Sequence, residues 1–208
     1  MGTIVKIDLG DRTEYRQNGK LHNINLPAIV HSNGTEEYYH KGKLHRAKGP
    51  AVIWPDGKKE WYQNGKLHRL KGPAVFWPNG TEEYYLYGRR ERKNDKAAVI
   101  CLNGHMEWWY NGVRHRGADE PAVICANGDR IWCSNGTVRR YNGKPSVITG
   151  DGIQYWYIGK ILHREWDKGP AIIYPDGKVR YYMYNREIFS WAESLFVIEE
   201  HKKGTPGY

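Results

Sequence analysis

One phrase recurs along the chain at a nearly constant period, and this period constrains the fold more than any other feature of the sequence. The segment PDGKKEWYQNGKLHRLKGPAVFWPNG begins at Pro55 and ends at Gly80 on nearly the phrase with which it began. The turn glycine of this phrase recurs at intervals of 23 to 25 residues, at Gly10, Gly34, Gly57, Gly80, Gly104, Gly128, Gly152 and Gly177. Such a period predicts an array of eight similar units, each burying its apolar face against its neighbours.

A second glycine and an aromatic residue keep the same phase. The second glycine stands at Gly19, Gly42, Gly65, Gly88, Gly112, Gly136 and Gly159, with Asn185 in the eighth copy. Four residues before it lies what we call the first aromatic row: Tyr15, Tyr38, Trp61, Tyr84, Trp108, Trp132, Tyr155 and Tyr181. Eight buried aromatic side chains would contribute roughly 30 to 50 kcal/mol of gross hydrophobic stabilisation. We therefore expect this row to form the core.

Each unit has the sequence of a β-hairpin. The segment PAVIW, from Pro50 to Trp54, is β-branched and aromatic, and the PDG that follows supplies a tight turn with glycine at a position that favours a positive φ. The segment KKEWYQ then returns as the second strand, and NGKLHRLKG forms the connecting loop. The prolines at the start of the first strand, where a missing N–H costs little, are Pro50, Pro73, Pro121, Pro145 and Pro170.

The only sustained helical spacing lies near the C-terminus, from Ser190 to Gly204. Ser190 is suited to cap this helix together with Glu193, three residues on. The expected apolar face comprises Leu195, Phe196 and Ile198, and the end is marked by Lys202, Lys203 and Gly204. We expect the helix to cover the open edge or the apolar face of the last hairpin.

These patterns predict an all-β fold, an elongated single-layer antiparallel sheet of eight tandem β-hairpin repeats with a short C-terminal α-helix as a cap. The expected organisation is an array over residues 1–189, a capping helix over 190–204 in the same domain, and a tail over 205–208. Almost the whole chain of 208 residues is repeat, which leaves no room for a second, catalytic domain.

Composition favours a reduced, cytoplasmic setting. The chain has three cysteines against sixteen tyrosines and nine tryptophans. Cys101 and Cys125 hold the same place in consecutive repeats, which would separate them by two strand spacings, roughly 10 Å, too far for a disulfide. The sequence shows no signal peptide or transmembrane run, and Lys6 stands where a myristoylation site needs Ser or Thr. The net charge of +9 is compatible with a polyanionic partner.

The motifs that would indicate an enzyme are missing from the sequence, and no G-x-S-x-G, C-x-x-C or H-E-x-x-H occurs. Five histidines occupy one repeat position, at His22, His45, His68, His115 and His163. Side chains about 10 Å apart cannot converge on one metal ion, so we expect them to bond to neighbouring backbone. The carboxylates Glu37, Glu60, Glu83 and Glu107 also form a row and not a facing pair. We predict a non-enzymatic protein with no cofactor and no metal.

A second row of aromatic residues follows the first, one position on in most repeats: Tyr39, Tyr62, Tyr85, Trp109, Trp156 and Tyr182. Side chains alternate along a strand, so this row should point to the face opposite the first row. Two interpretations stay open. The second aromatic row packs under the folded-over loop, where Leu21, Leu44 and Leu67 would meet it, or it forms an exposed surface that binds a partner.

A row of arginines follows the histidine position, at Arg46, Arg69, Arg92, Arg116, Arg140 and Arg164, with Asn23 in the first copy. Lysines lie close by, at Lys48, Lys71, Lys96, Lys144 and Lys168. The arginine row is a candidate binding stripe for a polyanion. Its alternatives are a solvated edge that prevents sheet association and local pairing with the glutamate row.

The segment WYQNGKLHRLKGPAVFWPNGTEEYY resembles units of the MORN repeat family, which are hairpins of about this length with an aromatic residue, an N-G-K-x-H loop and a D-G or N-G turn. The resemblance is greatest to a variant with Gly-Pro-Ala after the loop, of the kind seen in bacteria and in large DNA viruses or phages, and it covers nearly all of residues 3–189. It implies a single curved antiparallel sheet used as a scaffold, for self-association and, in some members, for phospholipid contact. The usual unit has G-x-G after the histidine, whereas this chain has HRAKGPA from His45 to Ala51, a departure that argues against the lipid contact.

We therefore expect a non-enzymatic binding or scaffold module that recognises a protein partner through the repeat sheet, such as a phage or viral factor acting on a host protein. The alternative is a polyanion binder that uses the arginine row on nucleic acid or anionic lipid.

Overall fold

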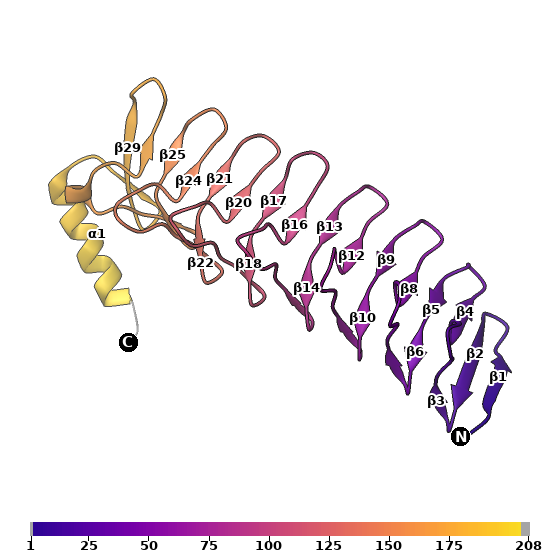
Figure 1. The fold of residues 1–208 in the computed structure, drawn as a ribbon. Helices are drawn as coiled ribbons and strands as arrows, with labels where there is room; N and C mark the ends of the chain where they lie inside the picture. The colour runs from indigo at the N-terminus through magenta and orange to yellow at the C-terminus, as the bar shows by residue number, and fades with distance from the viewer. Residues whose placement is uncertain (1, 205–208) are drawn as a thin grey trace. The chain divides into compact units, whose positions relative to one another are not determined.

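The structure is a computed structural model that describes residues 2–204, so the expected tail over 205–208 lies outside the described residues. It is built of β-strands except for a short 3-10 turn, η1 (Trp166–Lys168), and one helix, α1 (Trp191–Gly204) (Figure 1). The chain forms two compact units. The first contains the residues up to Asn103 with Trp109–Gly112, and the second contains Gly104–Trp108 with the residues from Val113 onward.

Repeats two to seven each supply four short strands instead of the two expected. In the third repeat β8 (Val52–Ile53) and β9 (Lys59–Glu60) flank the PDG turn, and β10 (Tyr62–Gln63) and β11 (Lys66–Leu67) flank the Asn-Gly turn. The expected return strand is therefore interrupted at Trp61, and part of the expected loop is the strand β11. The first two strands join an antiparallel ladder, and the last two form a separate small hairpin (Figure 1).

In the first unit the ladder runs in chain order, each strand antiparallel to its neighbour. It comprises β1 (Ile4–Asp8), β2 (Arg12–Gln17), β4 (Ile29–His31), β5 (Glu36–Glu37), β8, β9, β12 (Val75–Phe76), β13 (Glu82–Glu83) and β16 (Val99–Ile100). The small hairpins of this unit are β2 with β3 (Lys20–Leu21), β6 (Tyr39–His40) with β7 (Lys43–Leu44), β10 with β11, and β14 (Tyr85–Leu86) with β15 (Arg89–Arg90). The unit also contains β18 (Trp109–Tyr110).

The second unit continues the same pattern. Its ladder comprises β17 (Met106–Glu107), β20 (Val123–Ile124), β21 (Arg130–Ile131), β24 (Val147–Ile148), β25 (Gln154–Tyr155), β28 (Ile172–Ile173) and β29 (Val179–Met183). Its small hairpins are β22 (Cys133–Ser134) with β23 (Thr137–Val138), β26 (Tyr157–Ile158) with β27 (Ile161–Leu162), and β29 with β30 (Arg186–Ile188). The unit also contains β19 (Val113–Arg114).

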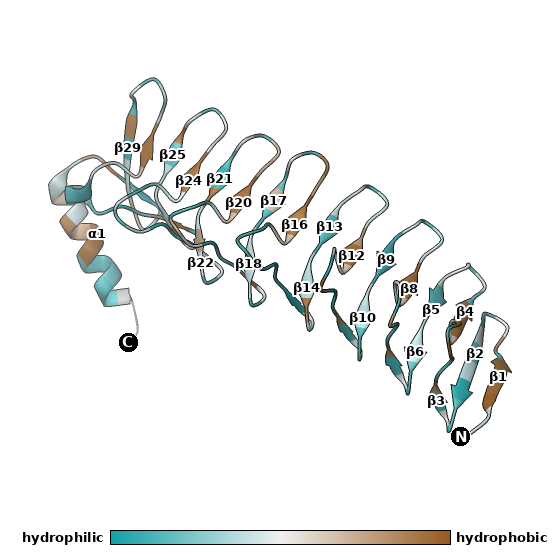
Figure 2. Cartoon of the chain, in the orientation of Figure 1, coloured by the Kyte–Doolittle hydropathy of each residue, from teal (hydrophilic) through white to brown (hydrophobic). Residues whose placement is uncertain are grey.

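The core of each repeat centres on the first ladder strand, as the apolar colouring of β8, β12 and β20 shows (Figure 2). Every full repeat places a small residue at the start of this strand, usually alanine, followed by a buried β-branched residue in most copies. The small residues are Ala28, Ala51, Ala74, Ala98, Ala122, Ser146 and Ala171. The alanine side chains are fully buried (0 % exposed), so this row is more deeply buried than the first aromatic row, whose members range from buried to half-buried. This row was not among the features predicted from the sequence, although the repeated Pro-Ala pair marks it.

The structure corrects the alignment of the seventh repeat by one position. Trp156, predicted for the second aromatic row, occupies the first-row position, because its backbone N–H donates to Ala171 O just as that of Trp132 donates to Ser146 O. Tyr155 lies in the ladder strand β25, opposite Val147. The small hairpin of this repeat turns at Gly159-Lys160, at the same distance from Trp156 as the turn at Asn135-Gly136 is from Trp132, but its glycine is the first turn residue and not the second. Counting back from the second glycine therefore selected the wrong residue.

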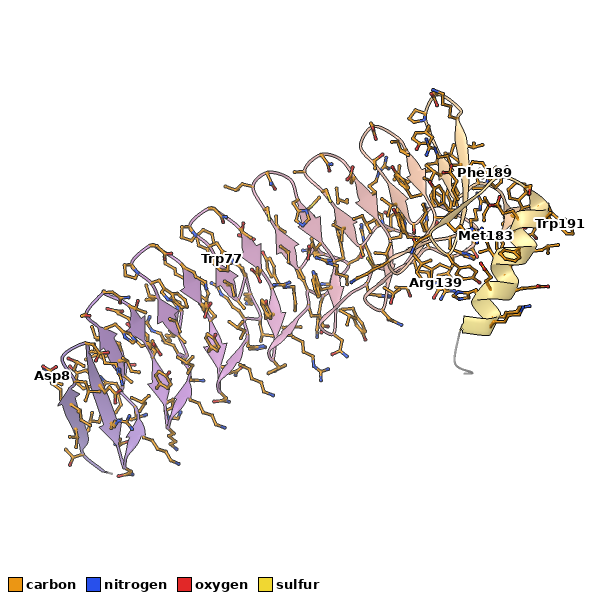
Figure 3. The ribbon with its side chains drawn as sticks, turned by 180° about the vertical axis from the view of Figure 1, so that it is seen from behind. Asp8, Trp77, Arg139, Met183, Phe189 and Trp191 are labelled. Carbon is orange, nitrogen blue, oxygen red and sulfur yellow. The ribbon has the colours of Figure 1, made fainter. Side chains whose placement is uncertain are left out.

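The helix begins as predicted but buries a different face. Ser190 Oγ accepts a hydrogen bond from the N–H of Glu193 (3.2 Å), and the Glu193 carboxylate accepts one from the N–H of Phe189 (2.9 Å). Val197 packs with Met183 and Ile188 of the last hairpin, and Ile198 lies against the same cluster. The expected contacts of Leu195 and Phe196 are wrong, because both are exposed on the other side of the helix. The helix thus covers the apolar face of the last hairpin, and Met183 lies beside it in Figure 3.

Replacing Met183 by Ala should lower the free energy of unfolding by about 2 to 5 kcal/mol, because the side chain is only 2 % exposed and its loss leaves a cavity under α1. The matched control is Phe196→Ala, which should cost less than about 1 kcal/mol because Phe196 is exposed. Urea denaturation of both variants measures the difference. Equal losses would contradict the assigned face of the helix.

Candidate functional site: a groove between the repeat loops

Each first-row aromatic residue is the joint between the ladder and the small hairpin. At Trp61 the backbone N–H donates to Ala74 O of the next repeat (2.8 Å), and the carbonyl accepts from the N–H of His68 (2.9 Å). The same two bonds recur at Tyr15, Tyr38, Tyr84, Trp108, Trp132 and Trp156. Because these two bonds go to different segments, the chain leaves the regular ladder at the aromatic residue and changes direction there.

Every arginine of the predicted row lies on the first-row aromatic ring of its own repeat. The guanidinium carbon is 3.6 to 4.2 Å from the ring centroid in the pairs Arg46–Tyr38, Arg69–Trp61, Arg92–Tyr84, Arg116–Trp108, Arg140–Trp132 and Arg164–Trp156. The same guanidinium donates through Nη1, at 3.0 to 3.4 Å, to the carbonyl that closes its loop, on Pro50, Pro73, Ala97, Pro121, Pro145 and Pro170 respectively. We call this double contact the arginine clasp.

The clasp differs from the two alternatives to a binding stripe that the sequence suggested for the arginine row. All six side chains are half-buried, so they do not form a solvated edge, and their recurrent partners are aromatic rings and loop carbonyls instead of the glutamate row. Asn23 makes the same loop contact without a charge, donating Nδ2 to Pro27 O at 3.0 Å. The arginines therefore hold the loops in place, and a role in binding a polyanion stays a prediction.

The histidine row bonds to backbone, as predicted, and it does so between repeats. His22, His45 and His68 each accept at Nδ1, at 3.2 Å, the N–H of the first turn residue in the next small hairpin. His115 and His163 do the same at 3.4 and 3.3 Å. A backbone N–H can only donate, so each of these rings carries no proton on Nδ1. Burial lowers the pKa of His22, His68 and His163, which favours this neutral form.

The second aromatic row packs within the small hairpins, which supports the packing interpretation. Tyr39 lies directly opposite Leu44, and Tyr62 lies opposite Leu67. The hydroxyls of Tyr39, Tyr62 and Tyr85 donate to Glu37, Glu60 and Glu83 at 2.8 to 2.9 Å. Tyr182 donates to Glu187 at 3.1 Å, and Trp109 lies half-buried with Arg90 4.8 Å from its ring. Binding by this row stays a prediction.

The glutamates form a row with separate partners. Glu60 and Glu83 both pair in register with Val75, one on each side, so two strand spacings, about 10 Å, separate them. Trp77, labelled in Figure 3, and Arg90 both donate to Glu83, at 2.9 and 2.6 Å. Burial raises the pKa of Glu83, but these donors and Tyr85 outweigh it, and the pKa is lowered. Two other members of the row contact a histidine: His31 Nε2 lies 2.8 Å from Glu37, and His105 Nε2 lies 3.2 Å from Glu107.

Grooves of the same construction lie between the loops of consecutive repeats at three places in the described part of the chain. They lie between repeats one and two, three and four, and six and seven, with volumes of about 820, 320 and 280 Å³. Their floor is the clasped aromatic, Tyr38, Tyr84 or Trp156. One wall is formed by the residue two positions after this aromatic, which is His40, Leu86 or Ile158. The rim is formed by the loop residue that follows the clasp position of the preceding repeat, which is Ile24, Leu70 or Tyr141.

The rim presents apolar side chains and lysines. Ile24, Leu70 and Tyr141 are 61, 78 and 56 % exposed. Of the lysines predicted beside the arginine row, Lys48, Lys96, Lys144 and Lys168 line the three grooves. Sequence reasoning missed the groove, because each copy is assembled from residues of two repeats.

Among the described residues, no three His, Cys, Asp or Glu side chains lie where they would hold a metal ion. No described helix has the length and apolar character needed to span a bilayer. The groove instead offers a shaped surface of aromatic, apolar and cationic groups, which suits recognition of a ligand.

Comparison with family models yields no match for the chain. A comparison with curated proteins yields none either.

Replacing Arg69 by Ala should lower the free energy of unfolding by about 2 to 3 kcal/mol, because it removes both the stacking on Trp61 and the charged hydrogen bond to Pro73 O. Arg130→Ala, at an exposed ladder position, is the charge-matched control and should stay within about 0.5 kcal/mol of the parent. Denaturant titration followed by tryptophan fluorescence gives both values. A clasp variant as stable as the control would show that the arginine is dispensable to the loop.

The histidine bonds predict a loss of stability in mild acid. Because the folded protein lowers the pKa of His22, His68 and His163, their contribution is complete above the unfolded value of about 6.5 and is lost as the pH falls below it. The melting temperature should therefore fall between about pH 7.5 and pH 5. His68→Asn places a non-titrating oxygen near the position of Nδ1 and should make this fall shallower. A melting temperature that is constant across this range would contradict the assignment.

Proposed function

We propose that the chain is a non-enzymatic, MORN-like repeat scaffold that recognises a protein partner through the row of loop grooves. The observation that carries the proposal is that grooves with the same clasped aromatic floor have different residues at their rim and wall. The aromatic floor and the clasp stay constant, whereas the rim changes from Ile24 to Leu70 to Tyr141. A constant frame with variable exposed residues is how repeat proteins build a specific binding surface.

A protein partner fits this surface better than a polyanion does. The exposed rim side chains are apolar, and such residues gain free energy by contact with apolar groups of another protein. The six arginines that suggested polyanion binding already make two contacts each within their own repeat. Engaging a phosphate would compete with those contacts.

The alternative function, polyanion binding, is better supported by lysines than by the arginine row. Lys20, Lys43 and Lys66 take the same place in three consecutive small hairpins and are exposed. Lysines in such a row would attract phosphates without sequence preference and with a steep dependence on salt. A role as a phage or viral factor acting on a host protein rests on the resemblance alone.

Capture experiments with two leucine variants test the proposed function. Leu70 lies on a groove rim, and Leu102 lies at a ladder turn, and they are similarly exposed, at 78 and 82 %. Immobilised protein is incubated with nuclease-treated lysate of the source cell. We expect Leu70→Asp to reduce capture of the main protein partner at least about tenfold, as for a central interface residue, and Leu102→Asp to leave it unchanged. Capture that depends on nucleic acid, or that is insensitive to Leu70→Asp, would contradict the proposal.

A further inference from the structure

The groove between repeats one and two differs from its equivalents in size and in the lack of a carboxylate in its lining. At about 820 Å³ it is more than twice the volume of either of the others. Six of its lining residues are basic or imidazole side chains: His22, His40, Lys41, His45, Arg46 and Lys48. Its lining contains no Asp or Glu, whereas the equivalent grooves contain Glu91 and Glu165.

The histidines of this groove are close together. The ring centroids of His22 and His40 are 5.1 Å apart, and those of His40 and His45 are 5.7 Å apart. Burial, followed by the neighbouring His40 and Lys41, lowers the pKa of His22, which shows that the surroundings disfavour further positive charge. Along the described chain, no carboxylate lies within ion-pair distance of Lys41 or Lys48. An anion in the groove would relieve this unbalanced charge.

The rim of the groove indicates what carries the anion. Ile24 and Leu26 are exposed by 61 and 63 % and line the groove together with Tyr38 and Tyr39. A free phosphate or a nucleic-acid backbone would leave these apolar side chains without a matching group. A polypeptide with acidic and apolar side chains in alternation matches both the cationic lining and the apolar rim.

We infer that the groove between repeats one and two binds carboxylate side chains of an acidic, partly apolar segment of the partner protein. Lys41 and Lys48 attract the carboxylates, while Ile24 and Leu26 contact the neighbouring apolar side chains. This inference rests on the proposed function and names the chemistry of the partner segment. The acidic segment of the partner would therefore bind at the first two repeats.

The test uses the full chain and fluorescein-labelled peptides in fluorescence anisotropy at about 50 mM salt, where surface charges are weakly screened. The probe is a repeated Glu-Glu-Leu peptide, and its uncharged control is a Gln-Gln-Leu peptide of the same length. We expect the acidic peptide to bind at least about tenfold more tightly than the control. Equal affinities, or no binding of the acidic peptide, would overturn the inference.

Two charge reversals locate the binding. Lys48→Glu lies in the groove, and Lys59→Glu makes the same change in net charge on the exposed ladder strand β9. We expect Lys48→Glu to weaken binding of the acidic peptide about tenfold and Lys59→Glu to change it by less than about twofold. Melting curves of both variants check that the fold is kept. Equal weakening by the two variants would overturn the inference, because binding would then follow net charge alone.

A competition experiment separates a polypeptide from a nucleic acid. An oligo-dT strand that displaces the acidic peptide at equal or lower concentration would overturn the inference in favour of a phosphate ligand. Failure of the peptide to bind while lysate capture still depends on Leu70 would contradict this inference alone. Failure of both experiments would contradict the proposed function as well.

Discussion

The arginine clasp on the first-row aromatic ring is the contact on which the rest of each repeat depends. At the aromatic residue the chain leaves the ladder, and the N–H and C=O of this residue form hydrogen bonds with two different neighbouring segments. The guanidinium covers the ring and bonds to the carbonyl at the end of the loop, so it ties the joint, the loop and the next ladder strand together. A half-buried arginine can do this because its planar group stacks on a ring while its N–H groups still donate at the edge.

The clasp also explains why the repeats combine a uniform frame with a variable surface. The residues that hold each loop lie under it or at its ends, which leaves the middle of the loop free to vary. In the first repeat this middle is Ile-Asn-Leu, in the third it is Leu-Lys-Gly, and in the sixth it is Tyr-Asn-Gly-Lys. Histidine bonds also join the small hairpins of five of the repeats to those of the next repeat. Loops fixed at their ends present their exposed side chains with little loss of entropy on binding.

The sequence predicts those parts of this structure that depend on local backbone chemistry. The turn glycines, the antiparallel pairing and the capped start of α1 at Ser190 follow from residue type and spacing, and the structure confirms them. The direction of a side chain is harder to predict, because it depends on neighbours that are distant in the sequence. Leu195 and Phe196 show this, since the apolar pattern could not reveal which side of the helix meets Met183. The groove was beyond prediction for the same reason, as Ile24, His40 and Arg46 come together only when two repeats stack.

Hydrogen exchange of the Arg69→Ala variant, resolved by residue with NMR, tests the role of the clasp most directly. The account predicts that the amides of Trp61, His68 and Ala74 exchange markedly faster than in the parent, because their bonds join the segments that Arg69 ties together. The ladder amides of β1 and β2, at the far end of the same unit, should keep their protection. Unchanged exchange at Trp61, His68 and Ala74 would contradict the claim that the arginine clasp holds the repeat together.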